Sequence, residues 1–530
     1  MTSPSDDEVN LDELQLRAQG HIPQLPRRFS FMSLLAFGFA IMNSWIGFVS
    51  LLLTSLSLGG PPAAFWSTIV ACVAAWIIAA GLAELASAFP SSGGQYHFTF
   101  MVAPIEYRAP LAFVTGWLSV LAYLFATSSG AIFIAESVVG LAEVYHPGYH
   151  AETWHVWLVF AAVIITAFVA VTIAPSIVPK TQSLFFWTSV LGVTAITVTL
   201  LAVSPSKQSA ATTFTAYQNS SGWPSGMSFM LAVGQSMWSF SCIDSATHIA
   251  EEIPQPGKYV PRAMMIGMAL GLITSIGFSL AIIFSATDFQ AIAASPSPMY
   301  EAYGQAMQST EGATVFAFIL IFIYYGAALG LMTTTGRLIW AFSRDGGLPF
   351  SRVFERIDEK RAVPVNSNLL SCVFCLAYGL IYIGSEVAFN VFISSAILFM
   401  NLSYTIPQAV LLFRGNRREV LVARHFDLGN VLGVFCNVFA VLWMGLYTVI
   451  FCFPLALPTN AKGMSYVSVV LAGALLFVAA LWFLGGKRRT FIGPVTAIDA
   501  LEAVNIASTM PMGKLDRERA SESAAIEAMR

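Results

Sequence analysis

Long apolar stretches separated by short polar segments dominate the chain. No charged residue occurs between Phe29 and Ala83, and Gly59-Gly60-Pro61-Pro62 divides this stretch into two parts. Each part is close to the roughly 20 residues that a helix needs to cross the hydrocarbon core of a bilayer. The chain contains twelve such stretches, and we expect a membrane-spanning helix in each: 30–56, 63–88, 110–135, 155–175, 183–203, 227–247, 263–286, 313–340, 366–384, 387–412, 431–454 and 466–485.

The composition favours a polytopic all-α membrane protein and argues against other classes. Hydrophobic residues make up 56% of the 530 residues and charged residues 10%, whereas soluble proteins carry roughly 25% charged residues. The apolar stretches are continuous, which argues against a membrane β-barrel with its alternating pattern. The net charge of −3 argues against a nucleic-acid partner. The six cysteines lie in apolar segments, so we expect packing residues and neither a metal nor a bound cofactor.

Positive charges predict the orientation of the chain. When the N-terminus is placed in the cytosol, every lysine and arginine except Lys207 and Lys462 falls on the cytosolic side, as the positive-inside rule requires. We therefore expect cytosolic tails at 1–29 and 486–530. The sequon Asn219-Ser220-Ser221 then lies outside, where Asn219 is a candidate for glycosylation.

Two spans contain polar residues at mid-membrane, where helices of transporters are often interrupted. The first span contains Asn43, Ser44, Trp45 and Ile46, and the sixth contains Trp238, Ser239, Phe240 and Ser241. A helix break exposes backbone amides that attract a carboxylate and carbonyls that attract an amine or cation. Close helix packing through small residues explains either span alone equally well. Their corresponding places, first and sixth, predict two inverted repeats of five helices.

Ionisable residues inside spans are expensive and therefore functional candidates. Asp244 follows the sixth-span break, and we interpret it as a group that attracts an ammonium substrate or titrates during coupling; pairing with a polar neighbour is the alternative. His248 is expected near the cytosolic face. Glu84 is expected at a cytosolic gate, paired with Arg337.

Other acids and rings extend this list of candidates. Glu136 is expected in the outer vestibule or as a hydrated residue, and Glu251 and Glu252 as solvated residues. Aromatic rings offer their faces to a cation. Besides Trp238, the candidates are Tyr324, Tyr325 and Tyr123.

Three sequence segments resemble the signatures of amino acid–polyamine–organocation transporters. They are ELASAFPSSGGQY at 84–96, the stretch from Asp244 to Ala263, and RLIWAFSRDGGLP at 337–349. The segments AIMNSW at 40–45 and RRTFIGP at 488–494 are most similar to the fungal amino acid/choline branch, which includes γ-aminobutyrate and choline permeases. The resemblance covers roughly 30–490.

The resemblance implies a transport core at 30–412, built of inverted repeats at 30–203 and 227–412 with broken first and sixth helices. Two further helices follow at 413–485. It also implies secondary active transport of amino acids or related amines across the plasma membrane, with a proton as coupling cation. The first-helix break would hold a substrate carboxylate, although Trp45 departs from the family's glycine-rich pattern there.

Alternatives to a symporter remain at this stage. A substrate exchanger, a nutrient sensor with little flux, and a transporter of the vacuolar membrane all share this architecture. An intramembrane enzyme would need paired aspartates on facing spans or an HExxH motif, and the sequence contains neither. We therefore expect a transporter that takes a small-molecule substrate in a lipid bilayer, and no enzyme.

Overall fold

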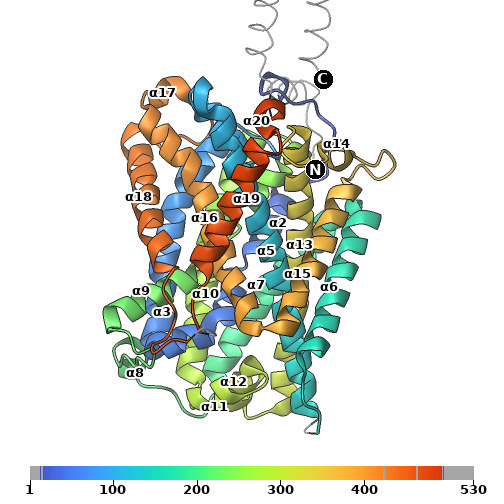
Figure 1. The fold of residues 1–530 in the computed structure, drawn as a ribbon. Coiled ribbons are helices and arrows are strands. Elements are labelled where there is room, and N and C mark those ends of the chain that lie inside the picture. The colour runs from blue at the N-terminus through green and yellow to red at the C-terminus, as the bar shows by residue number, and fades with distance from the viewer. Residues whose placement is uncertain are drawn as a thin grey trace, which may run out of the picture.

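The computed structural model describes residues 12, 16–146, 148–421, 424–460, 463–491 and 493–494, and the side chains of all of these except 386–390. In this part of the chain, regular structure is helical apart from one isolated bridge between Asp358 and Val363. Nine of the described helices are long and apolar enough to cross a membrane. They run side by side as a bundle (Figure 1). The fold is therefore an all-α polytopic membrane protein.

The apolar runs of the sequence become the long helices. These are α2 (Phe31–Met42), α3 (Ser44–Ala88), α5 (Ile105–Tyr145), α6 (Thr153–Ile173), α7 (Val178–Val203), α10 (Pro256–Ser285), α13 (Thr310–Arg344), α15 (Val365–Gly384), α16 (Glu386–Arg414), α18 (Gly429–Ile450) and α19 (Val467–Phe483). Short helices join them: α4 (Gln95–Val102), η1 (Pro175–Ile177), α8 (Ala210–Phe214), α9 (Ser225–Ser236), η2 (Met237–Phe240), η3 (Ile243–Glu252), α11 (Phe289–Ala294), α12 (Pro298–Met307), α14 (Ser351–Phe354), α17 (Arg417–Val420) and α20 (Lys487–Thr490).

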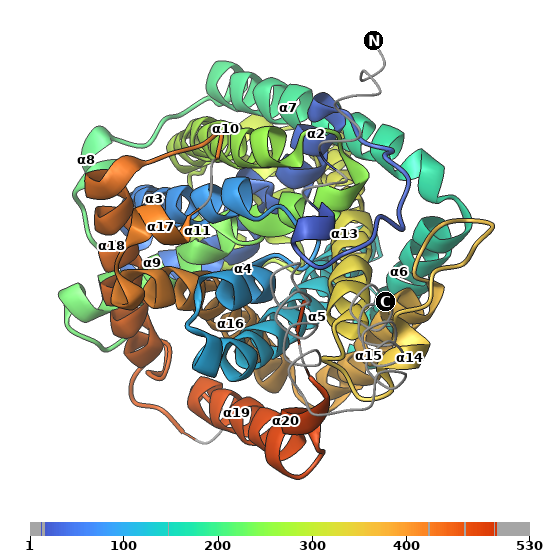
Figure 2. The ribbon, with the colours of Figure 1, turned by 90° about the horizontal axis from the view of Figure 1, so that it is seen from above.

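The helices occupy central and peripheral positions in the bundle (Figure 2). The most apolar window of α5 is 89% buried within the protein, whereas the corresponding windows of Pro175–Val203 and α18 are 39% buried. An apolar helix that leaves most of such a window uncovered presents it to lipid. α5 is therefore the central helix that can line an internal site, and α7 and α18 form part of the lipid-facing surface.

Helix breaks explain why the structure has fewer long helices than the twelve expected spans. The first two expected spans fall in α2 and α3, and α3 is interrupted at Gly59 and Gly60, where Gly60 has φ 70°. The expected span 227–247 is divided among α9, η2 and η3. The expected span 466–485 contains α19, which has 17 residues.

The two helix breaks at Asn43 and Cys242 face each other. The first lies at Asn43, whose φ of 29° separates α2 from α3, and the second at Cys242, whose φ of 62° separates η2 from η3. Gly47 on α3 lies directly against Ser239 on η2, because a Cβ built on this glycine would be 2.6 Å from the Cα of Ser239. Only glycine allows this approach.

The bundle has two ends that differ in their short helices. α14, α17 and α20 lie at one end, called here the α20 end, and α8, α11 and α12 lie at the other, called here the α12 end (Figure 1). Lys487 of α20 donates to the carbonyl of Gly346 at 2.7 Å, and His21 contacts Asp345 at 3.1 Å. The segments next to both tails therefore lie at the same end. Which side of a membrane this end faces stays a prediction.

Candidate functional site

A cavity of about 440 Å³ lies between the two helix breaks. Its wall comes from α2, α3, α5, η2 and α13 and from the link between η2 and η3. The described residues that line it carry no charged side chain: Ile41, Met42, Asn43, Ile46, Gly47, Ser50, Gly130, Phe133, Trp238, Ser241, Cys242, Tyr324, Ala327 and Leu331. The uncharged lining suits a molecule that needs no fixed counter-charge.

Three aromatic rings form one wall of this cavity. The ring of Phe133 lies 6.1 Å from that of Trp238 and 6.2 Å from that of Tyr324, measured between centroids. The Tyr324 hydroxyl is 2.7 Å from the hydroxyl of Ser50, which holds the phenol ring in place. Aromatic faces attract cations through their quadrupole, so this wall can hold an organic cation without an acid.

Polar groups at the first-helix break complete the cavity. Trp45 Nε1 donates to Ser189 Oγ at 2.9 Å, and Ser189 Oγ donates to Asn43 Oδ1 at 3.1 Å. This chain fixes the Asn43 amide and leaves its Nδ2 buried, with no hydrogen-bond partner among the described residues. Because a buried unpaired donor is costly, Asn43 Nδ2 is suited to donate to an oxygen of a bound molecule.

A wider vestibule of about 1580 Å³ adjoins the cavity on the side of the α12 end. The two hollows share Ser50, Phe133 and Tyr324, so these side chains separate them. Glu136 lines this hollow and accepts a hydrogen bond from Tyr382 Oη at 3.1 Å. An outer vestibule was one of the two places expected for Glu136.

The vestibule is acidic. Glu143 and Glu152 also line it, and its described lining contains no lysine or arginine. Walls that carry charge of one sign concentrate ions of the opposite sign. The vestibule therefore favours the approach of cations.

Asp244 lies outside the cavity lining and is fully buried behind it. Its carboxylate accepts hydrogen bonds from Gln95 Nε2 at 2.7 Å and Tyr123 Oη at 2.6 Å, and from the hydroxyl of Tyr404. His248 Nε2 lies 2.9 Å from the same carboxylate. In this conformation Asp244 therefore joins η3 to α4, α5 and α16 and does not face a substrate.

His248, expected near the cytosolic face, is buried within the protein, and its place relative to that face stays a prediction. The imidazole is fully buried. Its Nδ1 lies 3.0 Å from the carbonyl of Ser92, which can only accept, so Nδ1 carries a hydrogen. Its Nε2 faces Asp244 Oδ2, so the imidazole lies between a carbonyl and a carboxylate.

The predicted pairing of Glu84 with Arg337 is wrong. Glu84 accepts from Arg424 Nε at 2.8 Å and contacts the guanidinium of Arg417, and Arg337 donates through Nε to Glu252 at 2.9 Å. The partners lie on segments that only the packing brings together, because α17 folds over the end of α3 while η3 lies beside α13.

The expectation that Glu251 and Glu252 are solvated is also wrong. The side chain of Glu252 is 1% exposed and that of Glu251 is 2% exposed, and Glu251 contacts Arg344 at 3.0 Å. Buried carboxylates need such partners to stay ionised. Burial opposes ionisation of Glu251, but Arg344 holds the pKa of Glu251 below its ordinary value.

The segment before α2 closes the α20 end. Phe29 N donates to the carbonyl of Glu252 at 3.1 Å, and Tyr96 Oη donates to Asp345 at 2.9 Å beside His21. Burial opposes ionisation of Asp345, but His21 and Arg344 hold the pKa of Asp345 below its ordinary value. Ion pairs and hydrogen bonds thus seal the α20 end, and on the opposite side only the shared side chains separate the cavity from the acidic vestibule.

Several sequence-predicted residues lie near the cavity without lining it. Ser44 and Trp45 are buried behind the first break, where the Trp45 ring packs 5.1 Å from that of Phe278. Ser239, Phe240 and Tyr325 likewise do not line the cavity. Sequence reasoning missed Phe133, since a lone phenylalanine in an apolar span carries no local signal. Asn219 lies in the loop before α9, where its Nδ2 donates to the carbonyl of Trp223.

Comparisons with known proteins agree with this architecture. The sequence model of the family described as amino acid permease matches residues 29–475. The chain is 32% identical to the choline transporter of Saccharomyces cerevisiae over 89% of this chain and 84% of that protein. It is 30% identical to the transmembrane transporter swnT of Metarhizium robertsii over 88% and 92% of the two chains. It is also 30% identical to an uncharacterized amino-acid permease of Schizosaccharomyces pombe over 94% and 92%. The chain therefore belongs to the amino acid permease family and is a membrane permease for amino acids or amines.

Proposed function

We propose that this permease is a secondary active transporter of a small organic cation of the choline class. The observation that carries the proposal is an uncharged, aromatic-walled cavity that adjoins an acidic vestibule. A quaternary ammonium needs no hydrogen-bond acceptor and binds well among aromatic rings. The similarity to a choline transporter supports the same substrate class.

Each part of the cavity has a role in this proposal. The ammonium group lies against Phe133, Trp238 and Tyr324, where cation–π attraction replaces part of its hydration. The oxygen of the substrate accepts from Asn43 Nδ2, the buried donor that has no partner within the described protein. The acids of the vestibule raise the local concentration of the cation before it enters.

We further propose that a proton drives uptake and that Asp244 and His248 carry it. Nε2 of His248 lies 2.9 Å from Oδ2 of Asp244 in a fully buried network. Opening of the α20 end must separate η3 from α4 and α5, which breaks the bonds from Gln95 and Tyr123 to Asp244. A carboxylate that loses its donors binds a proton more readily. Conformational change and protonation are therefore linked.

An ω-amino acid such as γ-aminobutyrate is the second candidate substrate. α3 begins at the cavity with no side-chain cap on its N-terminus, so its first amides and the positive end of its dipole can receive a carboxylate. This interaction would use the same donor region as Asn43 Nδ2. The two candidates differ in whether the substrate carries a net positive charge.

The charge pattern of the loops supports a cytosolic α20 end and an external vestibule. We propose that the protein takes its substrate up across the plasma membrane with both termini in the cytosol. A substrate exchanger, a sensor with little flux and a location in the vacuolar membrane are the alternatives.

Transport by the purified chain in liposomes tests these proposals. Labelled choline, γ-aminobutyrate, neutral and basic amino acids and polyamines are offered outside, with an imposed pH gradient or with none. We expect saturable choline uptake that the inward proton gradient accelerates. Choline accumulation without any effect of the gradient would contradict the coupling, and exclusive γ-aminobutyrate uptake would contradict the substrate class. Exchange without net accumulation would identify an exchanger.

A further inference from the structure

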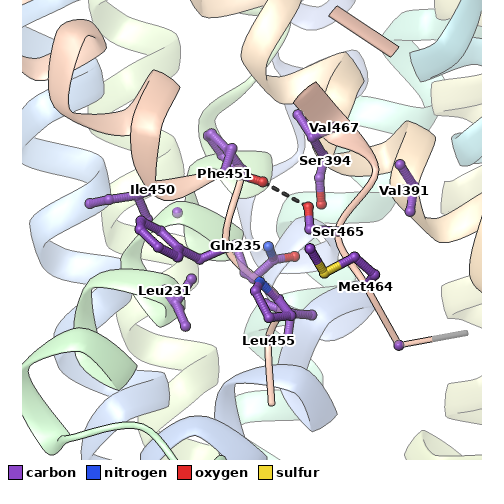
Figure 3. Close-up of a pocket in the computed structure, with 14 residues that line it drawn as sticks. Leu231, Gln235, Val391, Ser394, Ile450, Phe451, Leu455, Met464, Ser465 and Val467 are labelled. Carbon is purple, nitrogen blue, oxygen red and sulfur yellow. Dashed lines mark hydrogen bonds between the residues drawn. The ribbon is translucent and has the colours of Figure 1, made fainter. Parts of the chain in front are cut away.

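A second cavity, of about 600 Å³, lies beside the end of α9 (Figure 3). It shares no lining residue with the cavity between the breaks. α9, α16, the end of α18 and the connection from α18 to α19 line it, and no charged side chain is among the described lining residues: Leu231, Gly234, Gln235, Val391, Ser394, Ile450, Phe451, Phe453, Pro454, Leu455, Gly463, Met464, Ser465 and Val467.

One buried polar side chain points into this cavity without a partner. Gln235 is 6% exposed, its amide is directed into the cavity in Figure 3, and it has no hydrogen-bond partner in the described part of the protein. The hydroxyl of Ser394 in the same lining is also unpartnered there. Ser465 differs, because its hydroxyl donates to the carbonyl of Phe451 at 2.8 Å. An amide that faces a cavity and has no partner within the described protein favours a ligand that forms hydrogen bonds.

The mouth of this cavity is apolar. Phe453, Leu455 and Met464 on the connection to α19 are 39%, 37% and 42% exposed. Exposed apolar side chains that gather in one place mark interaction sites, including sites of contact with a membrane. The cavity therefore opens beside the lipid-facing helix α18.

We propose that this cavity binds a neutral bilayer lipid that carries a single hydroxyl group. The absence of charge from the described lining disfavours phospholipid head groups, whose charges would be buried without partners. A hydroxyl both donates and accepts, as the amide of Gln235 does. The apolar body of the lipid packs on Leu231, Val391 and Ile450.

The position of this lipid site links it to the cavity between the breaks. Gln235 lies on the last turn of α9, directly before η2, which carries Trp238. A lipid held between α9, α16 and α18 restrains α9 where it enters the break. The lipid therefore changes the affinity of the cavity for its ligand without touching it.

Photochemical labelling of the full-length protein in nanodiscs tests the lipid site. The probes are a photoreactive sterol and a photoreactive diacylglycerol, each with one hydroxyl, and a photoreactive phosphatidylcholine as the charged control. Mass spectrometry locates the labelled peptides. We expect a hydroxyl lipid to label the peptides that contain 227–236 and 451–467 in excess over phosphatidylcholine, and the more effective probe identifies the lipid class.

Substitutions separate the site from general lipid contact. Gln235→Leu leaves no protein partner unpaired and should lower labelling about 2- to 10-fold, the effect of one hydrogen bond. Ser394→Leu fills the cavity and should lower labelling by at least as much. Thr448→Val on α18 is the matched control, since Thr448 does not line the cavity and its hydroxyl already donates to the carbonyl of Met444 at 2.7 Å, and it should label as the wild type does. Equal labelling of Gln235→Leu and wild type, or labelling no stronger than that of phosphatidylcholine, would overturn the proposal.

Discussion

Replacement of Trp238 by alanine measures the contribution of the aromatic wall. The indole is half-buried, lies 6.1 Å from the ring of Phe133 and lines the uncharged cavity. A cation–π contact contributes about 0.5–1 kcal/mol at an exposed site and about 2 kcal/mol when desolvated. Because the indole is half-buried in the cavity wall, a contact of about 1–2 kcal/mol predicts that Trp238→Ala raises the apparent Km for choline about 5- to 30-fold. Trp238→Phe retains a π face and should lose less.

A competition assay distinguishes loss of the cation contact from loss of shape. The competitor 3,3-dimethylbutan-1-ol has the shape of choline but a carbon in place of the charged nitrogen. We expect Trp238→Ala to weaken inhibition by choline much more than inhibition by this neutral isostere. Trp187→Ala is the matched control, because Trp187 is 52% exposed and does not line the cavity. If both competitors weaken equally, the ring acts by packing, and the cation–π reasoning is refuted.

Four further predictions concern the buried charges and the topology. Asp244→Asn is expected to lower net transport at least 10-fold, yet to keep substrate binding from the vestibule side and substrate exchange. Asp244→Glu is expected to retain part of the net transport. If Asp244→Asn accumulates substrate as the wild type does from pH 5 to 7.5, the carboxylate is structural. Glu84→Gln leaves two arginines short of a partner and should destabilise the purified protein by about 3–5 kcal/mol, whereas Asp427→Asn, at a side chain 56% exposed, should leave the melting temperature almost unchanged. Arg344 holds the pKa of Glu251 below its ordinary value, so this carboxylate stabilises the fold above about pH 4 and loses that effect only as the pH falls through its lowered pKa. Glu251→Gln should therefore reduce transport by the same factor at pH 5 and at pH 7.5. A loss of transport confined to pH 7.5 would contradict this reasoning. A reporter fused to the C-terminus should read as cytosolic, and an external reading would reject the orientation.

Local sequence determined the class of the protein and the position of its helix breaks. Apolar runs near the length of a bilayer predicted a polytopic helical protein, because lipid excludes unpaired backbone and charged side chains from long stretches of chain. Polar residues at Asn43 and at Trp238 to Ser241 predicted the interruptions, because small polar side chains in mid-span weaken a helix locally. The signature segments predicted the permease family, which the comparisons confirm.

Only the tertiary structure decided which side chains meet. Glu84 and its partner Arg424 are 340 residues apart in the chain, and no local pattern distinguishes this pair from the incorrect pairing of Glu84 with Arg337. Phe133 became part of the cavity because α5 is central in the bundle. Asp244 lies behind the cavity because donors from three other helices surround its carboxylate. Hydropathy predicts whether a residue is buried, whereas the partner of a buried charge depends on which helices pack together.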